Sequence, residues 1–342
     1  MNEALGRPRV VPRVSDLIGY TPLLELCRTE TGSRLLLKLE MFNPTGSAKI
    51  RMARAMVDAA EERGELSAGG HIIESTSGNT GLGLAVIAAE RDYTFTAVVD
   101  HHAAVDKLRA MKAMGAELVY VADDGSEDLA TAAREEHAVG LARGKANTTF
   151  TEQHNNPANG AGYFPVAHEL HQALDDGIDV LIAAVGTGGA LCGTARELRL
   201  LTPDFITIGV EPKGSIAFGG PAHDYYQSGT GTPEGAEIGA LVDYDLIDEG
   251  VKVGDIEAFA TARAVARTGL LIGGSAGGVV HAALARLPLL PPGSTMVALI
   301  NDGGEKYLDT IFNDDWMNAR ALLDPAAERE IEETLRKLRR NR

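Results

Sequence analysis

Apolar runs alternate with stretches of helical periodicity along most of this chain. The runs are continuous, as in strands of parallel sheets that are covered on both faces. They occupy residues 35–40, 72–74, 95–100, 118–122, 180–185, 206–211 and 296–300. Helices are predicted between them, with starts near Ser47, Asn79, Ala103, Ser126, Gly162, Gly189, Asp255 and Ser275. The alternation predicts an α/β protein with right-handed crossovers and with ligands at the carboxyl ends of strands.

Two segments break this alternation. Residues 214–239 are rich in Gly, Pro, Tyr and Ser and have weak periodicity, which predicts a long surface or active-site loop. Beyond Trp316 the chain becomes charged, and residues 324–342 have helical spacing with mixed charges, which predicts a solvated terminal helix or tail. Few residues follow Met317, so no appended regulatory domain is expected.

Composition narrows the class of protein. The 342 residues are 44% hydrophobic, enough for two closely packed lobes. A formal net charge of −16 argues against a general basic face for nucleic acid or acidic membrane, so the expected partners are small molecules and a second copy of the chain. The first residues lack an apolar signal core, and Cys27 and Cys192 are the only cysteines, which favours a reduced, cytoplasmic protein.

A glycine-rich turn follows one predicted strand. Gly186-Thr187-Gly188-Gly189 stands before a helical pattern, where several backbone N–H groups and a helix N-terminus can hold a phosphate. The turn has no lysine and lacks the spacing of a nucleotide P-loop, which favours a single phosphate group over a triphosphate. Taken alone, the turn is equally well explained by ordinary turn geometry.

Two further small-residue turns stand at strand-to-helix junctions. Residues 75–81, Ser-Thr-Ser-Gly-Asn-Thr-Gly, offer hydroxyl, amide and backbone donors that suit a carboxylate. Residues 273–278, Gly-Gly-Ser-Ala-Gly-Gly, offer one hydroxyl among residues that permit close approach. Helix capping or tight packing explains each of these turns when it is considered singly.

Lys49 follows a Pro-Thr-Gly turn at the start of a predicted amphipathic helix. Desolvation and the helix dipole both disfavour an ammonium there, and a neutral amine can form an imine. A surface lysine is the simpler interpretation of Lys49 alone. Together with a phosphate turn, a carboxylate turn and a lone hydroxyl, however, the amine completes the set of groups that pyridoxal phosphate chemistry needs.

Four motifs, in this order, resemble the cysteine synthase and cystathionine β-synthase family of fold-type II pyridoxal phosphate enzymes. They are Asn-Pro-Thr-Gly-Ser-Ala-Lys at 43–49, Thr-Ser-Gly-Asn-Thr-Gly at 76–81, and the turns at 186–189 and 273–278. The likeness extends from about Ile18 to Trp316. It implies a two-lobed fold like that of the tryptophan synthase β subunit, in which each lobe is a mostly parallel sheet flanked by helices. The expected parts are a large cofactor-binding lobe (residues 1–46 and 154–323), a smaller mobile substrate-carboxylate lobe (47–153) and the charged C-terminal segment (324–342).

The resemblance also implies residue roles. Lys49 would bind the cofactor as an imine and later move the α-proton, Asn79 would hydrogen-bond the cofactor's ring oxygen, and Ser275 would face the pyridine nitrogen. A hydroxyl keeps that nitrogen less protonated than a carboxylate does, which favours β-elimination over transamination. The phosphate would lie against Gly186, Thr187, Gly188 and Gly189, and the substrate carboxylate against Thr76, Ser77, Thr80 and Gln153. No metal is implied, because His101 and His102 lack spaced partners.

The implied reaction is a β-replacement. An activated serine, O-acetylserine or O-phosphoserine, would pass through an aminoacrylate to cysteine or a related β-substituted alanine, with sulfide narrowly ahead of an amino acid as nucleophile. Residues 302–308 and 311–317 look more like cystathionine β-synthase cores. Residues 74–79 and 213–219 resemble synthases that join O-phosphoserine to glutamate on the way to diaminopropionate. The family also implies a homodimer.

Some positions depart from the family pattern: Ile50, Ser75, Ala190 and Glu237. Ala190 lacks a hydroxyl that would donate to the phosphate, and Glu237 falls in a segment that borders the active-site entrance in relatives, so it bears on the second substrate. Lys213 could favour an anionic leaving group or acceptor, although a solvated loop lysine is the simpler interpretation. Two other functional classes stay open: a lyase or deaminase in which water takes the aminoacrylate, and a non-catalytic relative that serves as a binding or regulatory partner.

Overall fold

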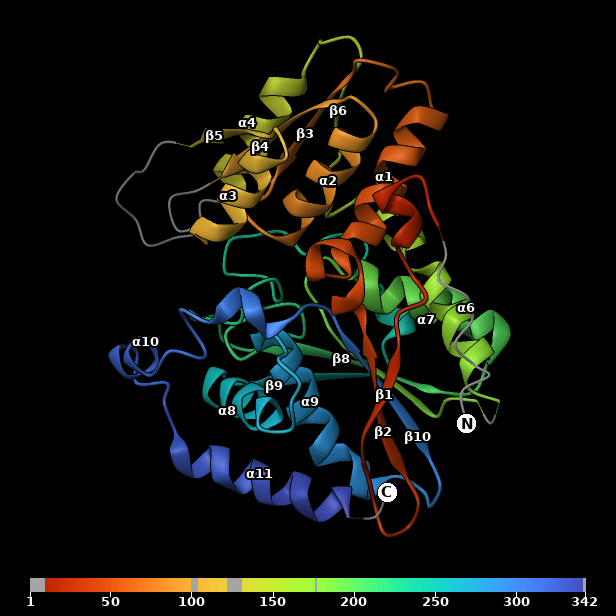
Figure 1. Cartoon of the computed structure of the whole chain (residues 1–342), viewed down its shortest axis with the longest axis vertical. Helices are drawn as coiled ribbons and strands as arrows, with labels where there is room; N and C mark the ends of the chain where they lie inside the picture. Colours follow the sequence, from red (N-terminus) through yellow and green to blue (C-terminus); the bar gives the residue numbers. More distant parts are fainter. Residues whose placement is uncertain (1–9, 100–103, 122–130, 176, 341–342) are drawn as a thin grey trace.

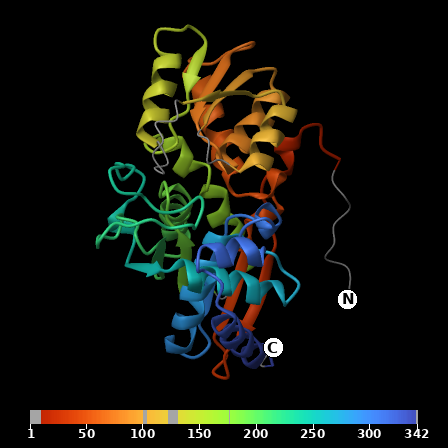
Figure 2. The ribbon, with the colours of Figure 1, turned by 90° about the vertical axis from the view of Figure 1, so that its left-hand side faces the viewer.

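The structure, a computed structural model, describes residues 10–99, 104–121, 131–175 and 177–340. These residues form two lobes, each built on its own sheet, with the smaller lobe above the larger one in Figure 1 and in the side view of Figure 2. Among the described residues, the larger sheet has the strand order β1-β2-β10-β7-β8-β9 and the smaller sheet has the order β5-β4-β3-β6. Every strand pairing between them is parallel except that of β1 with β2. The predicted α/β class with mostly parallel sheets is confirmed.

The strands and helices alternate as the apolar pattern predicts. The strands are β1 (Leu23–Arg28), β2 (Arg34–Leu39), β3 (His71–Ser75), β4 (Thr94–Val99), β5 (Glu117–Tyr120), β6 (Thr148–Phe150), β7 (Val180–Ala184), β8 (Ile206–Pro212), β9 (Glu249–Val253) and β10 (Thr295–Ile300). The α-helices are α1 (Lys49–Glu62), α2 (Asn79–Glu90), α3 (Val105–Ala113), α4 (Thr131–Ala142), α5 (Pro157–Ala161), α6 (Phe164–Ala173), α7 (Gly189–Leu201), α8 (Asp255–Ala266), α9 (Gly274–Arg286), α10 (Asp314–Ala319) and α11 (Pro325–Arg339).

Helix α1 lies between the cores of the two lobes. Met52 and Met56 pack into a core of the large lobe, whereas Ala53 and Val57 pack into the core beneath the small sheet. Helices α1 and α2 approach closely, since a Cβ on Gly83 would come within 2.9 Å of the Ala53 side chain. A helix that is apolar on opposite faces is buried between two partners. The first residue of α1, Lys49, is therefore positioned by both lobes.

All seven predicted strands are present, and the described residues contain three more that the prediction lacks. Strand β6 has only three residues, and β9 contains Gly250 and the charged Glu249 and Lys252, so neither forms an apolar run. Strand β1 lies at an edge, pairs in the antiparallel direction and carries a bulge between Glu25 and Cys27. Edge strands need not be apolar on both faces, which explains why continuous hydrophobicity did not reveal them.

Helix starts agree with the prediction less uniformly. Ala103 and Ser126 lie outside the described residues, and the nearest helices begin at Val105 and Thr131. The helix predicted near Gly162 is instead a pair, α5 and α6, with Gly162 in the gap between them. A Cβ on Gly162 would come within 2.8 Å of the backbone of Arg51 and Met52, so this gap is where the chain passes against α1.

The expectation of a solvated terminal helix is wrong for one face of α11. Leu335 is 1% exposed, and Ile331 and Leu338 pack against the large-lobe core. An ion pair between Arg263 Nε and Glu328 Oε1, at 2.6 Å, fixes the start of α11 on α8. The opposite face of α11 is charged and exposed, so the helix is amphipathic. Within the described chain, no helix combines the length and the apolar character that crossing a membrane requires.

Candidate active site

Lys49 begins α1 at the junction of the lobes. Its side chain is partly buried, and burial lowers the pKa of its amine to about 8, although the nearby Asp302 carboxylate opposes this shift. The preceding turn is fixed to the large lobe, because the Ala48 N–H donates to the Asn301 carbonyl at 2.8 Å and Ser47 forms an isolated bridge with Asp302. Near pH 8, a large fraction of such amines is neutral, as imine formation requires.

Two residues predicted to hold the substrate carboxylate lie together at the ends of β3 and β6. Thr80 Oγ1 donates to Gln153 Oε1 at 2.8 Å, and Gln153 Nε2 donates to the Ser75 carbonyl at 3.3 Å. The carboxyl ends of parallel strands meet at one edge of a sheet, which is why these distant residues meet. Thr80 and Gln153 therefore belong to one site.

The other two predicted carboxylate residues have different surroundings. Thr76 Oγ1 accepts the Gly81 N–H at 3.1 Å, so this hydroxyl is bonded to the first turn of α2, whose N-cap is Gly78. Ser77 Oγ accepts from Arg134 Nη1 at 3.2 Å. Arg134, on α4, was missed in the sequence, where it is one of many charged helix residues. Its guanidinium places positive charge beside the loop proposed to bind a carboxylate.

The turn after β7 leaves no room for a side chain at Gly188 or Gly189. Gly188 has φ +86°, and a Cβ there would come within 2.5 Å of the Leu241 carbonyl oxygen. A Cβ on Gly189 would overlap the side chain of Asn159. The N–H groups of the first turn of α7 have no helical acceptors, so they are available to an anion. Ala190, in that first turn, contributes no hydroxyl.

Asn159 connects this glycine turn to the carboxylate residues. It is fully buried, and its Nδ2 donates to the Gln153 carbonyl at 2.7 Å and to Thr187 Oγ1 at 3.1 Å. Because Gln153 in turn accepts from Thr80, a continuous chain of hydrogen bonds joins the glycine turn to α2. No sequence pattern singled out Asn159, because one buried polar residue inside a helix as short as α5 leaves no periodic signal.

Asp302, after β10, connects the remaining motifs. Its Oδ2 accepts from Asn79 Nδ2 at 2.8 Å, and its carbonyl accepts the Gly273 N–H at 3.2 Å. Gly273 is the N-cap of α9, whose first turn contains the buried Ser275. With the bridge to Ser47, Asp302 thus touches the turns of Lys49, Asn79 and Ser275. The rule that ligands bind at the carboxyl ends of strands could have identified Asp302.

Two lysines besides Lys49 lie beside Asp302. Lys306 Nζ donates to Asn79 Oδ1 at 2.8 Å and to the Gly46 carbonyl at 3.0 Å, and burial lowers its pKa to about 8. Lys107, on α3, is 7% exposed, and its Nζ lies 4.9 Å from the ring centre of Tyr307. Burial lowers the pKa of Lys107 as well. The site is thus locally cationic in a strongly acidic protein, which suits anionic ligands.

The long loop of residues 214–239 borders the glycine turn, as an active-site loop should. The Gly231 N–H and Thr230 Oγ1 both donate to the Val185 carbonyl, at 2.7 and 2.8 Å. Beyond the loop, the Ala240 N–H donates to Asn155 Oδ1 at 2.9 Å. Lys213 lies apart from this contact, on the surface, 3.4 Å from Glu257 Oε1. Its simpler interpretation, a solvated loop lysine, is the one that the structure supports.

Glu237 belongs to a cluster of carboxylates at the edge of the site. Burial raises the pKa of Glu135, and the charges of Glu152 and Glu237 raise it further, whereas Arg134 lowers it. Glu135 Oε1 also lies 3.6 Å from His154 Nε2. Burial, together with the charges of Lys49 and Arg134, lowers the pKa of His154 to about 4, so this imidazole is neutral at pH 7.

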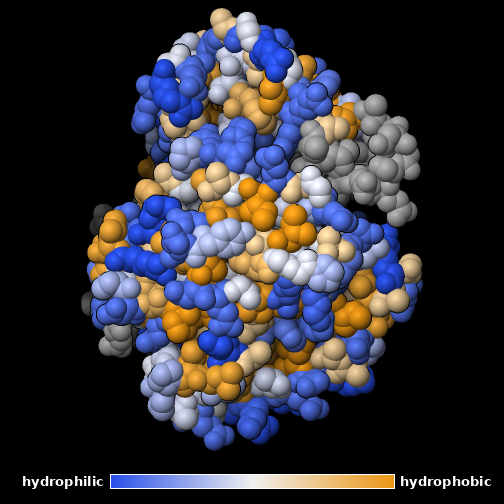
Figure 3. Space-filling view, turned by 180° about the vertical axis from the view of Figure 1, so that it is seen from behind, coloured by the Kyte–Doolittle hydropathy of each residue, from blue (hydrophilic) through white to orange (hydrophobic). Residues whose placement is uncertain are grey.

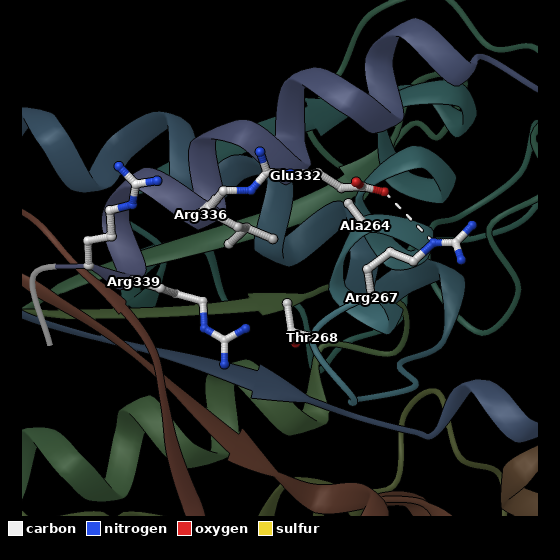
Figure 4. Close-up of a pocket in the computed structure, with 8 residues that line it drawn as sticks. Ala264, Arg267, Thr268, Glu332, Arg336 and Arg339 are labelled. Atoms are coloured by element: carbon white, nitrogen blue, oxygen red, sulfur yellow. Dashed lines mark ion pairs between the residues drawn. The ribbon is translucent and has the colours of Figure 1, made fainter.

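A surface pocket of about 330 Å³ lies elsewhere, between α8 and α11 (Figure 4). Arg267, Arg336 and Arg339 line it together with Glu332, whose Oε1 is 3.8 Å from Arg267 Nε. Arginines in the last turn of a helix stabilise its free carbonyl groups, which accounts for this charge. None of the predicted site residues lines this pocket.

The residues present fit pyridoxal phosphate. The glycine-rich turn at 186–189 can hold one phosphate, Lys49 can supply a neutral amine, and Asn79 and Ser275 each lie in the first turn of a helix. Asp302 Oδ1 is buried and has no hydrogen-bond donor among the described residues, which leaves an acceptor for a bound molecule. The four motifs that the sequence singled out therefore meet in one place.

Comparison with known proteins identifies relatives over most of the chain. The sequence model of the family described as pyridoxal-phosphate dependent enzyme matches residues 14–302. A candidate cysteine synthase of Sinorhizobium fredii is 50% identical, over 93% of this chain and 96% of that protein. Cystathionine β-synthase of Apis mellifera is 34% identical over 94% of this chain, which spans 66% of that longer relative. The crystal structure of cysteine synthase from Entamoeba histolytica superposes with a TM-score of 0.84, at 30% identity, covering 98% of each chain.

Proposed function

Because this chain belongs to the pyridoxal-phosphate dependent enzymes and is cysteine synthase-like within them, we propose that it makes cysteine by exchanging the acetate of O-acetylserine for sulfide. The observation that carries this proposal is the chain of contacts that runs from Thr187 through Asn159, Gln153 and Thr80 to α2. Asn79, at the start of α2, continues it to Asp302. These contacts support a site in which the turn proposed for the phosphate and the turn proposed for the carboxylate lie near Lys49, whose own turn bridges to Asp302 through Ser47.

Bound pyridoxal phosphate supplies an electron sink, which makes the α-proton of an attached amino acid acidic and lets a β-substituent leave. Lys49 is proposed to hold the cofactor and to carry the α-proton, for which a pKa near 8 is suited. Thr76, Ser77, Thr80 and Gln153 are proposed to bind the substrate carboxylate, with Arg134 adding positive charge behind Ser77. Ser275 is proposed to face the pyridine nitrogen.

Water must be kept from the reacting carbon if replacement is to outcompete hydrolysis. We propose that the lobe of residues 47–153 moves toward the lobe of residues 1–46 and 154–323 once the carboxylate is bound. The contact of Asn79 with Asp302 supports this, because it joins the start of α2 in one lobe to the end of β10 in the other.

An amino-acid acceptor, such as homocysteine, is the second candidate. Burial and the charges of Glu152 and Glu237 raise the pKa of Glu135 at the edge of the site, and an ammonium group bound there would relieve that repulsion. Sulfide carries no such group. The similarity to cystathionine β-synthase of Apis mellifera supports this candidate, and the higher identity to the candidate cysteine synthase favours sulfide. O-phosphoserine as donor, with glutamate as acceptor, is a further variant of the same chemistry.

Product analysis separates these candidates. The purified holoenzyme is given O-acetylserine or O-phosphoserine, each with sulfide, homocysteine or glutamate, and products are identified by mass, with Lys49→Ala as the control. Cysteine from O-acetylserine and sulfide, with slower turnover of the other pairs, is expected. Pyruvate as the main product in every mixture would instead indicate a lyase. If the protein binds no cofactor, the catalytic proposals all fail and a binding or regulatory role is left.

Assembly and location are separate proposals. A homodimer in the cytoplasm is expected for this family. Hydrophobic residues gather near the middle of the face seen in Figure 3, bordered by hydrophilic ones, as at many subunit contacts. Sedimentation of the purified protein as a monomer would contradict the dimer.

A further inference from the structure

The side-chain amide of Asn79 is held from both sides. Its Nδ2 donates to Asp302 Oδ2 at 2.8 Å, and its Oδ1 accepts from Lys306 Nζ at 2.8 Å. A carboxylate can only accept and an ammonium can only donate, so a single orientation of the amide satisfies both partners. Nδ2 carries two hydrogens, and only one of them is bound by Asp302. The other N–H has a fixed direction, and it has no acceptor among the residues that the structure describes, so it can donate to a ligand.

The two groups that hold this amide are themselves fixed. Asp302 is 3% exposed, and its Oδ2 also accepts from the Tyr307 hydroxyl at 2.6 Å. Burial and the neighbouring Asp302 charge raise the pKa of Tyr307, so its hydroxyl stays a donor across the physiological range. Lys306 Nζ is tied to the Gly46 carbonyl at 3.0 Å. Partners with so many fixed bonds do not rearrange at low cost.

The holding groups and the amide come from different lobes. Asp302 and Lys306 follow β10 of the large sheet, whereas Asn79 begins α2 above the small sheet. The same large-lobe segment meets the small lobe again where Lys107 of α3 lies over the Tyr307 ring. The amide thus has its fixed orientation only while α2 lies against Asp302 and Lys306.

We propose that Lys306 and Asp302 are positioning residues that act through Asn79: they leave one amide N–H for the ring oxygen of the cofactor and make that hydrogen bond depend on contact between the lobes. The inference rests on the role proposed for Asn79. It adds two residues to the site that lie outside the four motifs. Neither residue has to touch the reacting atoms.

A cycle of variants tests this proposal. Cofactor affinity is measured by titrating pyridoxal phosphate into cofactor-free wild type, Lys306→Met, Asn79→Ala and the double variant, with exposed Lys112→Met as a control. Lys306→Met is expected to bind about tenfold more weakly, the effect of one charge-assisted hydrogen bond. Because Lys306 acts through Asn79, adding Lys306→Met to Asn79→Ala should weaken binding little further. Lys306→Arg should bind pyridoxal phosphate nearly as tightly as the wild type. Asp302→Asn should bind it about as weakly as Lys306→Met.

Readouts other than affinity separate positioning from plain stabilisation. Lys306→Met and Asp302→Asn should shift the pH titration of the bound cofactor's visible absorption band, while Lys112→Met should not. The proposal is overturned if the double variant loses as much affinity for the cofactor as the two single variants lose together. It is also overturned if Lys306→Met and Asp302→Asn lower the melting temperature but leave the pH titration of the cofactor band unshifted. Cofactor binding is measured without any acceptor, so a wild type that binds cofactor but makes no cysteine refutes the proposed function and still leaves this test valid.

Discussion

Arg51 and Glu40 form a buried, two-bonded ion pair one helical half-turn beyond Lys49. Arg51 Nε lies 2.6 Å from Glu40 Oε2, and Nη2 lies 2.8 Å from Glu40 Oε1. The same guanidinium bonds Glu169 on α6, which also accepts from Lys38 of β2. Two cations thus balance two carboxylates away from water. The network fixes the first turn of α1, and with it Lys49, to the large lobe.

Replacing Arg51 should destabilise the protein strongly. Arg51→Met leaves two buried carboxylates without their shared partner, and breaking a buried pair in this way costs about 3–5 kcal/mol. Urea unfolding followed by circular dichroism measures the loss. Arg63→Met is the matched control, because Arg63 and Glu65 also form a close pair but are each 47% exposed, so a loss under about 1 kcal/mol is expected. Equal losses for the two variants would show that burial does not govern the Arg51 pair.

Glu74 should make stability depend on pH. Burial raises the pKa of its carboxyl from 4.5 to about 8, against the hydrogen bond from Thr151 Oγ1 at 2.5 Å. Between about pH 4.5 and 8 the folded protein keeps a proton that the unfolded chain releases. The free energy of unfolding should therefore fall as pH rises through this window, by at most about 1.4 kcal/mol per unit from this group. Chemical denaturation at several pH values should show a smaller fall for Glu74→Gln, and an unchanged slope would contradict the assignment.

Lys49 should control how fast the cofactor attaches. Only the neutral amine attacks an aldehyde, and its pKa is about 8 in the cofactor-free protein. Attachment, followed by absorbance after mixing, should accelerate about tenfold per pH unit well below pH 8 and level off above it. Lys49→Arg should not attach the cofactor at any pH and should lose activity by about 10²–10⁴-fold or more. A pH-independent rate would mean that another step limits attachment.

Gly189→Ala should disrupt the phosphate turn without unfolding the protein. The added Cβ would overlap the Asn159 side chain, which joins Thr187 to Gln153. Weaker cofactor binding and a raised KM for the amino-acid donor are expected together, because one displaced side chain serves both subsites. Gly140→Ala on α4 is the control: a Cβ there meets nothing within 4 Å, and helix propensity favours alanine by about 1 kcal/mol. An effect on cofactor binding alone would show that Asn159 does not couple the subsites.

The glycine turns and Lys49 were predicted from the sequence. Their chemistry depends on backbone shape and on one amine, and each of these features can be recognised from a few consecutive residues. The sequence did not indicate Asp302, Lys306 or Asn159. These residues act through partners that are distant in sequence, and a polar residue leaves no periodic signal when its partner lies in another element. The edge strands β1 and β9 were not predicted for a related reason. An edge strand pairs on one side and is partly exposed, so it lacks the apolar run that marks a central strand.

The position of α1 between two cores limits how the lobes can move. If the small sheet rotates, side-chain packing has to change around α1. There Met52 and Met56 contact one lobe, and Ala53 and Val57 contact the other. Atoms near a rotation axis travel less than atoms far from it. Lys49, in the first turn of α1, would therefore stay almost stationary while the turn that carries Ser77 sweeps a longer arc. One protein could then close on its substrate without displacing the amine to which its cofactor is attached.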